Sequence, residues 1–317
     1  MGIRRILTLD GGGIKGIFPV AFLTSIEQEV EGSISNYFDL IVGASTGGII
    51  ALGLGLGFTA KELLSFYEEF ANQVFCGERL PRFFRRVVFS KYCQEPFRKA
   101  LQEKFGDLKI GDSKIRLVIP TLNLETGKVY VYKTAHHRRF EKDYKECVVD
   151  VALATAAAPT YFPSHRNSSG TPLVDGGMWA NNPTGFAVVE AIGVLGWSQG
   201  DLRVLSLGCT TSPLDVGIGR HIGMGQIYWA CKVADVFMSG QSSASLGTAQ
   251  LLAGHENVFR ISPSLPAKRF SLDSIKETAS LRGLGFSEAR EALVRLRPVF
   301  FENPAEKFVP YHTEAQQ

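Results

Sequence analysis

The stretch Ile41-Val42-Gly43-Ala44-Ser45-Thr46-Gly47-Gly48 decides how this chain folds. It reads as a buried strand that runs into a Gly-x-Ser-x-Gly turn and then into an apolar helix. A serine between two glycines at such a junction lies on a sharp elbow, with its hydroxyl lifted clear of the sheet. Gly43 and Gly47 supply the space and the backbone angles that a β-carbon would obstruct. Because so short a pattern also arises by chance, the other parts of an acyl-transfer site must be found elsewhere in the chain.

The residues around the elbow alternate between strand and helix patterns. The predicted order is strand Ile3–Leu9, helix Lys15–Val30, strand Tyr37–Val42, helix Thr46–Leu56 and helix Thr59–Asn72. Thr59 and Glu62 predict a capping box at the start of the last of these helices. This order is typical of βαβ units, so we expect an α/β fold with a mostly parallel central sheet.

Similar patterns continue along the rest of the chain. They predict helix Lys91–Phe105, a hairpin of Ile115–Asn123 with Lys128–Lys133, helix Cys147–Ala157, helix Pro183–Val194, strand Leu202–Leu207 and a short strand Asn257–Ile261. After Pro263 we expect two charged amphipathic helices and a polar tail. We therefore predict a main domain of residues 1–262 and a C-terminal helical extension, residues 263–317, packed on the same domain.

Composition narrows the class of protein. With 317 residues, 45% of them hydrophobic and 21% charged, the chain has the make-up of an ordinary globular protein. A formal charge of +3 is too small to indicate a nucleic-acid partner. The five cysteines are dispersed without a C-x-x-C pair, which is typical of reduced thiols in a cytosolic protein and argues against structural zinc. The uncharged run of residues 40–58 contains six glycines and the serine elbow, so strand–turn–helix explains it better than a bilayer span, and we expect a soluble, cytoplasmic protein.

Three glycine-rich turns each follow a predicted strand, namely residues 10–16, 43–47 and 175–177. In a parallel sheet such turns gather at the carboxyl ends of the strands, where ligands bind. This arrangement would place Ser45 as a nucleophile beside Asp175 as a base. The helix that starts near Lys15 adds a favourable dipole for an oxyanion. The oxyanion donors would be the backbone amides of the glycine row, Gly11, Gly12 and Gly13.

The same glycines allow a second interpretation. Gly11, Gly13 and Gly16 fit G-x-G-x-x-G, and Glu31 follows at the distance of the acidic residue in a dinucleotide-binding fingerprint. That fingerprint requires an acid at the end of the second strand, where this chain has the serine elbow. A non-catalytic nucleotide-binding α/β domain is therefore the alternative from another class.

A Ser–His–Asp triad would need a histidine, and none of the six has the compact glycine-flanked context of Asp175. His136 and His137 are expected in a solvated polar turn, and His165 is the nearest candidate. A Ser–Asp dyad is the simpler hypothesis. Because aspartate has a reference pKa near 3.9, Asp175 would need desolvation to become a better base.

Three motifs in this order resemble the patatin-like phospholipase family: Asp10-Gly-Gly-Gly-Ile-Lys-Gly16, Gly43-Ala-Ser-Thr-Gly47 and Asp175-Gly176-Gly177. The segments Ala154–Phe162 and Asp175–Pro183 look like the family's segments around its catalytic aspartate. The resemblance covers about residues 3–262. It implies a three-layer α/β/α sandwich, in which residues 1–262 are the catalytic domain.

The resemblance also implies an activity and a site. The activity is that of a serine acyl hydrolase, a phospholipase A or lipid acyl hydrolase, which cleaves acyl esters of phospholipids and needs no metal or other cofactor. The catalytic residues would be Ser45 and Asp175. Lys15 matches the basic position after the glycines, where it would act on a phosphate or an oxyanion through its charge or would simply support the helix. The glycines Gly11, Gly12 and Gly13 would form the oxyanion hole, with support from Gly43, Gly47, Gly176 and Gly177.

Some small bacterial members of that family are effectors switched on by cyclic nucleotides in anti-phage defence, which degrade membrane phospholipid once activated. The resemblance therefore implies an alternative, a latent phospholipase that a cyclic dinucleotide activates.

Aromatic and arginine residues are interleaved in the segment Phe75–Tyr92. This pattern suits an element that dips into anionic lipid, and equally a surface loop whose aromatic side chains turn inward. A lid that controls access to the site would fit either interpretation. We expect peripheral contact with the inner face of the membrane, whose phospholipid surface is the substrate.

Overall fold

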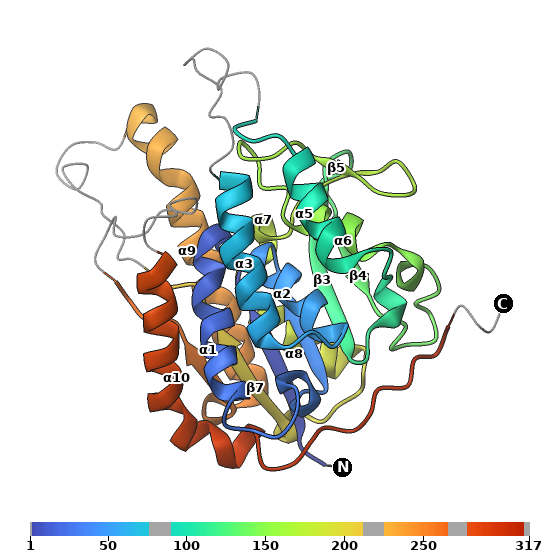
Figure 1. Cartoon of the computed structure of the whole chain (residues 1–317), viewed down its shortest axis with the longest axis vertical. Coiled ribbons are helices and arrows are strands. Elements are labelled where there is room, and N and C mark those ends of the chain that lie inside the picture. The colour runs from blue at the N-terminus through green and yellow to red at the C-terminus, as the bar shows by residue number, and fades with distance from the viewer. Residues whose placement is uncertain (1, 76–89, 212–224, 266–277, 314–317) are drawn as a thin grey trace.

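The chain forms a three-layer α/β/α sandwich around one mixed sheet (Figure 1). The structure, a computed structural model, describes residues 2–75, 90–211, 225–265 and 278–313. Its strands are β1 (Arg4–Leu9), β2 (Leu40–Gly43), β3 (Arg116–Asn123), β4 (Val129–Lys133), β5 (His165–Arg166), β6 (Pro172–Asp175), β7 (Leu202–Leu207) and β8 (Val258–Ile261). Its α-helices are α1 (Ile17–Glu27), α2 (Thr46–Gly55), α3 (Ala60–Phe75), α5 (Glu95–Phe105), α6 (Val148–Thr155), α7 (Gly177–Ala180), α8 (Thr184–Gly193), α9 (Gln226–Ala253) and α10 (Thr278–Phe300).

The central sheet is mostly parallel, as predicted. Strands β3, β2, β1, β7 and β8 lie side by side in that order and run in the same direction. Strands β4 and β6 join β3 in antiparallel fashion, and β5 pairs with β6 at the edge. The β3–β4 pairing confirms the predicted hairpin. All five parallel strands therefore end at one edge of the sheet, where the glycine-rich turns of residues 10–16 and 43–47 follow β1 and β2. The third turn, residues 175–177, follows β6, which is antiparallel, and it lies near the same edge because Asp175 pairs with Thr121 toward the end of β3.

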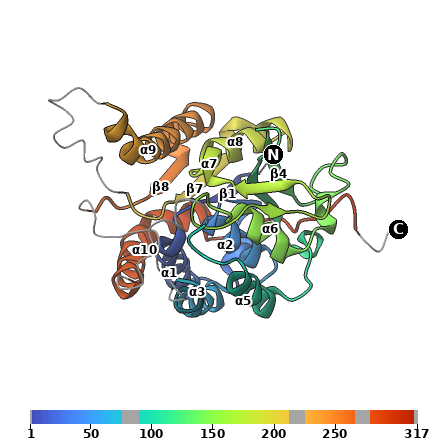
Figure 2. The same cartoon turned by 90° about the horizontal axis from the view of Figure 1, so that it is seen from above.

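Helices cover both faces of the sheet (Figure 2). Helices α1, α2, α3, α5, α6 and α10 lie on one face, and α7, α8 and α9 lie on the other. Side chains of β1 alternate between the two cores: Leu7 and Leu9 join the larger cluster, and Ile6 joins the smaller one. A parallel strand covered on both faces must be apolar on both, which explains the continuous apolar run at residues 40–42.

Several predicted boundaries shift by a few residues for identifiable reasons. The helix predicted from Lys15 begins as a 3-10 turn, Gly13–Gly16, before α1. The helix predicted from Lys91 begins at Glu95, since a proline fits the first helical turn and disfavours a helical conformation just before it. The capping box that opens α3 is confirmed, because Thr59 N–H donates to Glu62 and Glu62 N–H donates to the Thr59 hydroxyl.

The uncharged run of residues 40–58 is buried as β2, the elbow and α2. In the part of the chain that the structure describes, no helix has both the length and the apolar character needed to cross a bilayer. Most of the Phe75–Tyr92 segment, residues 76–89, lies outside the described residues. At its far end Tyr92 is buried and its ring lies beside that of Phe162.

The C-terminal residues pack on the main domain. Of the two helices predicted after Pro263, the described part holds one, α10, followed by an extended segment; residues 266–277 lie outside the described residues. Helix α10 lies along α1 (Figure 1), and Leu281, Leu296 and Phe300 are fully buried there. Farther on, Glu306 accepts a hydrogen bond from Arg4 at 2.6 Å. We propose that residues 263–317 belong to the same folding unit as residues 1–262.

Two glycines of α10 test this proposal, because they face opposite surroundings. A β-carbon at Gly285 would lie 2.6 Å from the Phe18 carbonyl oxygen and 2.8 Å from the Ala21 β-carbon, whereas one at Gly283 would meet nothing within 4 Å. We expect Gly285→Ala to lower the free energy of unfolding by about 1–3 kcal/mol through overpacking. Gly283→Ala should leave it unchanged or raise it by up to about 1 kcal/mol, since alanine favours a helix. Urea denaturation measures both, and equal stability of the two variants would contradict the packing of α10 on α1.

Candidate active site

The elbow at Ser45 depends on close backbone contact. Ser45 lies between β2 and α2 with φ 55° and ψ −127°, a conformation that residues other than glycine rarely adopt. A β-carbon at Gly43 would collide with the Gly47 carbonyl, and one at Gly47 would collide with the Leu9 carbonyl at the end of β1. Only glycine fits at these two positions, as the sequence predicted for the supporting glycines. The elbow therefore sits directly against the end of β1.

Thr155, at the end of α6, holds the backbone of the elbow. Its hydroxyl accepts a hydrogen bond from Ser45 N–H at 3.0 Å and donates one to the Pro120 carbonyl at 2.7 Å. Its own carbonyl accepts from Gly176 N–H at 3.2 Å. One fully buried threonine thus ties the serine turn to the aspartate turn. The unusual dihedral angles at Ser45 are supported by these fixed partners.

Ser45 and Asp175 meet at the carboxyl edge of the sheet. The Ser45 hydroxyl donates a hydrogen bond of 2.6 Å to Asp175 Oδ2. The other carboxylate oxygen accepts from Gly177 N–H at 2.6 Å, at the start of α7. Asp175 ends β6, where it pairs with Thr121 of β3. Because both oxygens are engaged by fixed donors, the carboxylate is held in one orientation toward the serine.

The surroundings of Asp175 change its acidity. The residue is 5% exposed, and burial raises its pKa to about 6, against the opposing effect of the hydrogen bonds from Ser45 and Gly177. The desolvation expected from the sequence is therefore present. A carboxylate with a pKa near 6 is a better acceptor for a serine proton than an exposed aspartate, and it stays largely ionised at neutral pH.

The glycine row lies beside the serine, but its three amides are not equivalent. Gly11 N–H donates to the Asn181 carbonyl at 2.9 Å, so this amide is already used and the prediction that it is an oxyanion donor is corrected. The amides of Gly12 and Gly13 donate to no described residue. Gly13 has φ 58°, which favours glycine, and its carbonyl accepts a hydrogen bond of 2.9 Å from the Thr46 hydroxyl.

Lys15 follows in the 3-10 turn. The residue is half-buried and makes no ion pair with any described residue. Burial lowers the pKa of its ammonium group, although the nearby Cys209 and Asp235 act in the opposite direction. A cation that is partly desolvated and lacks a protein partner can attract an anionic group of a bound molecule.

The histidines have partners of their own. His136 is buried and contacts Thr134 at 2.8 Å and Glu190 at 3.1 Å, so the expectation of a solvated position is wrong for this residue. His165 contacts Asp150 at 3.3 Å. No histidine in the described ranges forms a hydrogen bond with Ser45 or Asp175. Among the described residues, the serine and the aspartate therefore meet as a pair without an imidazole.

The dinucleotide interpretation does not fit the fold. Glu31 is exposed and precedes β2, so it lies toward the amino end of the sheet, away from the glycine turn that follows β1. The carboxyl end of β2, where the acid would be needed, carries the elbow and Ser45.

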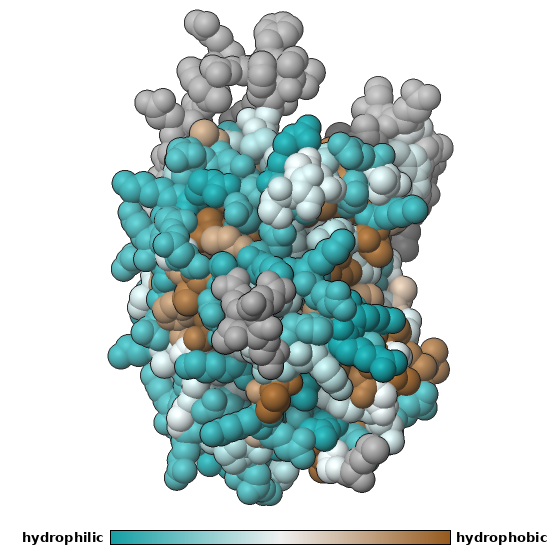
Figure 3. Space-filling view, turned by 90° about the vertical axis from the view of Figure 1, so that its right-hand side faces the viewer, coloured by the Kyte–Doolittle hydropathy of each residue, from teal (hydrophilic) through white to brown (hydrophobic). Residues whose placement is uncertain are grey.

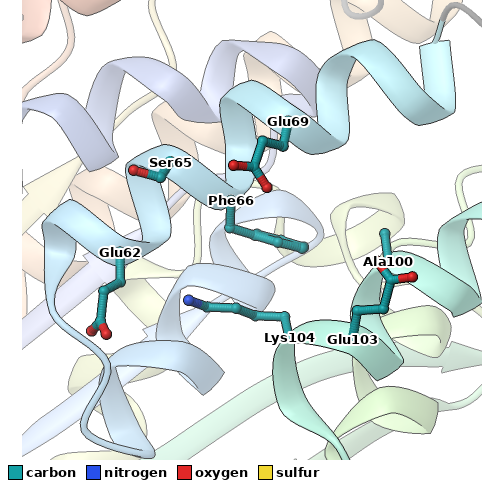
Figure 4. Close-up of a pocket in the computed structure, with 7 residues that line it drawn as sticks. All are labelled: Glu62, Ser65, Phe66, Glu69, Ala100, Glu103 and Lys104. Atoms are coloured by element: carbon teal, nitrogen blue, oxygen red, sulfur yellow. The ribbon is translucent and has the colours of Figure 1, made fainter.

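A separate cavity of about 280 Å³ lies between α3 and α5 (Figure 4). Its charged lining residues are Glu62, Glu69, Glu103 and Lys104. Glu62 is already engaged in the capping box, and Ser65 forms no hydrogen bond with a carboxylate in the part of the chain that the structure describes. The described residues of this cavity thus lack the serine–carboxylate pair that is found at the sheet edge.

Comparison with known proteins agrees with this geometry. The family model described as Patatin-like phospholipase matches residues 7–188, which include both Ser45 and Asp175. The chain belongs to the patatin-like phospholipase family. It is 36% identical over 299 residues to a cGAMP-activated phospholipase of Pseudomonas aeruginosa, covering 91% of this chain and 89% of that protein. It is 32% identical to a cGAMP-activated phospholipase of Vibrio cholerae, with 96% of both chains covered. Among solved structures, VipD from Legionella pneumophila is similar, with 14% identity, 92% of this chain and 67% of that chain covered, and a TM-score of 0.48.

As a member of this family the protein is a phospholipase, and hence a hydrolase. Sequence reasoning identified the serine, the aspartate and the glycine row of this phospholipase, and the structure brings them together. It missed Thr155 and Asn181, and also Arg260 of β8, whose guanidinium donates to both carboxylate oxygens of Asp10 at the start of the glycine row. Thr155 and Asn181 lie within segments that resembled the family, Ala154–Phe162 and Asp175–Pro183, so they could have been examined. Arg260 carried no local signal.

The raised pKa of Asp175 predicts how the serine responds to pH. Below about pH 6 the carboxyl group becomes protonated and can no longer accept the Ser45 proton. We expect the rate at which a fluorophosphonate probe labels Ser45 to fall about tenfold per pH unit below that value and to be constant above it. Asp175→Asn should react slowly and without this dependence. A wild-type profile that is flat from pH 4.5 to 7.5, measured on folded protein, would contradict the assignment.

Proposed function

We propose that this phospholipase cleaves acyl esters of phospholipids with Ser45 as nucleophile and Asp175 as general base. The observation that carries the proposal is the 2.6 Å hydrogen bond between the serine hydroxyl and a buried carboxylate of raised pKa. As Ser45 Oγ attacks the ester carbonyl carbon, its proton passes to Asp175. The tetrahedral intermediate collapses, and the departing alcohol, a lysophospholipid, takes that proton. Water then attacks the acyl-enzyme, gives one proton to Asp175 and releases the fatty acid as Ser45 regains its hydrogen.

The oxyanion of the tetrahedral intermediate would be bound by the amides of Gly12 and Gly13, since neither donates to a described residue. Gly11 instead anchors the turn through Asn181. We assign Lys15 to charge stabilisation close to these donors, because it is half-buried and makes no ion pair with a described residue. Gly43, Gly47, Gly176 and Gly177 would act by allowing the turns to pack.

We propose further that the enzyme is latent and is activated by a cyclic dinucleotide. The support is its similarity to two proteins named cGAMP-activated phospholipases, along nearly the whole chain in each case. A constitutively active enzyme is the competing possibility, and the two differ in the activity of the protein in buffer alone.

Peripheral contact with a membrane is the third part of the proposal. Trp229, Val233 and Phe237 recur every four residues on α9 and are 39%, 53% and 61% exposed. The amino-terminal part of α9 projects past the carboxyl edge of the sheet, where the site lies (Figure 1). One turn after Phe237, Gln241 Oε1 accepts from Asn182 N–H at 3.2 Å, so this helix face leads to the site. By contrast, the face shown in Figure 3 is mostly hydrophilic, with hydrophobic residues in scattered patches.

Fatty-acid release from phosphatidylethanolamine–phosphatidylglycerol liposomes, with and without cGAMP, tests the activity and its regulation. We expect the wild-type enzyme to hydrolyse lipid at least tenfold faster with cGAMP and Ser45→Ala to remain at background in both conditions, with an unchanged melting temperature. Ser65→Ala, an exposed serine of the α3–α5 cavity, is the matched control and should keep full activity. Hydrolysis by Ser45→Ala would contradict the assignment of Ser45 as nucleophile. Full wild-type activity in buffer alone would contradict the proposal that the enzyme is latent.

The α9 surface predicts a difference between aggregated and soluble substrates. Replacing both Val233 and Phe237 by serine should weaken liposome binding in a flotation assay and lower liposome hydrolysis several-fold. Hydrolysis of a water-soluble short-chain nitrophenyl ester should not change, because neither side chain takes part in the chemistry. Leu251→Ser, which alters an 87% exposed side chain at the other end of α9, is the control. Wild-type liposome binding by the double variant would exclude this surface.

A further inference from the structure

Arg260 of β8 forms an ion pair with Asp10, the residue that begins the glycine row. Its Nη1 donates to Asp10 Oδ1 at 2.8 Å and its Nη2 donates to Asp10 Oδ2 at 2.5 Å. The side chains are only 15% and 6% exposed. Such a two-pronged arrangement fixes both the position and the plane of a carboxylate, which a single hydrogen bond cannot do. The two residues are 250 positions apart in sequence, so only the fold brings them together.

Asp10 and Gly11 are the two fixed residues that precede the proposed oxyanion donors. Asp10 N–H donates to the Leu207 carbonyl at 3.0 Å, which ties the Asp10 backbone to the end of β7, while Arg260 ties its side chain to β8. The next amide, that of Gly11, is held by the Asn181 carbonyl at 2.9 Å. The amides of Gly12 and Gly13 follow immediately. Their direction is therefore set by how Asp10 and Gly11 are held.

A hydrogen-bond network runs from Arg260, the anchor of Asp10, to Asn182, the residue next to the anchor of Gly11. Nη1 of Arg260 also donates to Ser206 Oγ at 2.8 Å, and Ser206 Oγ lies 2.7 Å from Thr184 Oγ1. The Thr184 hydroxyl contacts Asn182 Oδ1 at 2.6 Å. Asn182 follows directly after Asn181, the partner of Gly11. Ser206, Thr184 and Asn182 are at most 1% exposed, so their hydrogen bonds are shielded from solvent. Such buried bonds hold the side chains in one arrangement.

Close packing confines the guanidinium. A β-carbon at Gly208 would lie 2.7 Å from Arg260 Nη2, so the arginine fits only because that position is glycine. Burial raises the pKa of Asp10 despite the guanidinium, whereas the pKa of Arg260 is raised overall by Asp10 against the effect of burial. The raised pKa of Asp10 favours its neutral form and the raised pKa of Arg260 favours its charged form. The two-pronged hydrogen bonding decides for the ionised form of both groups.

We propose that Arg260 is a positioning residue for the oxyanion hole, which acts through Asp10 to aim the amides of Gly12 and Gly13. This inference rests on the proposed function, because it takes those amides as the donors. The guanidinium does not touch the reacting atoms. It keeps the turn in the conformation that the transition state needs, so its loss should lower the rate of the chemical step and leave substrate binding intact.

Steady-state kinetics on Arg260→Gln, Arg260→Lys, Asp10→Asn and the double variant Asp10→Asn/Arg260→Gln test this role in the full-length enzyme. The substrate is a short-chain nitrophenyl ester, and every variant is assayed in the presence of cGAMP. We expect Arg260→Gln to lower kcat about 10- to 1000-fold with KM within about twofold of wild type. Arg260→Lys should recover part of the loss, because it keeps the charge but not the two-pronged geometry. Affinity for a trifluoromethyl ketone lipid analogue, which forms an oxyanion when Ser45 adds to it, should fall in parallel with kcat/KM.

Arg116→Gln is the matched control. Arg116 is a half-buried arginine that begins β3. It lies at the amino end of the parallel strands, whereas the site lies at their carboxyl end, and it donates to the Asp39 carbonyl at 3.2 Å. Its replacement should lower the melting temperature and leave kcat unchanged. This control separates an effect on the oxyanion hole from a general loss of stability.

Three results would overturn the proposal. One is an unchanged kcat in Arg260→Gln, and another is a loss that appears only in KM. The third is a double variant whose kcat falls by the product of the two single effects, because residues that act through one another are not additive. If Arg260→Gln does not fold, the same criteria are applied to Arg260→Lys and Asp10→Asn. Ser45→Ala, measured alongside, separates the two hypotheses: activity in that variant refutes the dyad, whereas normal kcat in Arg260→Gln with an inactive Ser45→Ala refutes the positioning role alone.

Discussion

The hydrogen bond of 2.6 Å from Ser45 to Asp175 joins two turns that lie 130 residues apart, and much of the fold serves to make it possible. Ser45 must leave β2 on a sharp elbow, and Asp175 must end β6 beside it. The elbow requires the end of β1 to accept Gly47 at van der Waals contact, and Thr155 must reach from α6 to the serine amide. A carboxylate of raised pKa results, because the same packing that positions Asp175 also removes it from water.

Neighbouring carboxylates show how environment assigns different tasks to the same side chain. Asp10 and Asp175 are both buried at the carboxyl edge of the sheet. Asp10 faces a guanidinium that holds both of its oxygens, which suits a structural ion pair. Asp175 accepts hydrogen bonds from a hydroxyl and a backbone amide, and no cation of a described residue is in hydrogen-bond contact with it, so it can accept a proton. The difference lies in the partners that the fold supplies, since both residues precede a pair of glycines in the sequence.

Helix α9 connects the interior of the site with the surface. Near its middle, Gln241 and Ser245 hold Asn182 from two sides, and Asn182 belongs to the network that reaches Asp10. Toward its amino end the helix exposes Val233 and Phe237. A displacement of this helix at a lipid surface, or on binding of an activator, would change the position of the glycine row through a few buried hydrogen bonds. The hydrogen bonds from α9 through Asn182, Thr184, Ser206 and Arg260 to Asp10 provide a physical route for such coupling.

The amino-acid sequence by itself determined the α/β class, the βαβ order, the β3–β4 hairpin and the three turns that carry Ser45, Asp175 and the glycine row. These features are local: strand and helix periodicity, a capping box and the demand for glycine at tight turns all act between residues close in the chain. Tertiary structure alone decided that the Gly11 N–H donates to the Asn181 carbonyl, that His136 is buried, and that Arg260 pairs with Asp10. It also decided the acidity of Asp175. Desolvation and long-range pairing depend on which distant segments pack together, and no periodicity in a single stretch of sequence records that.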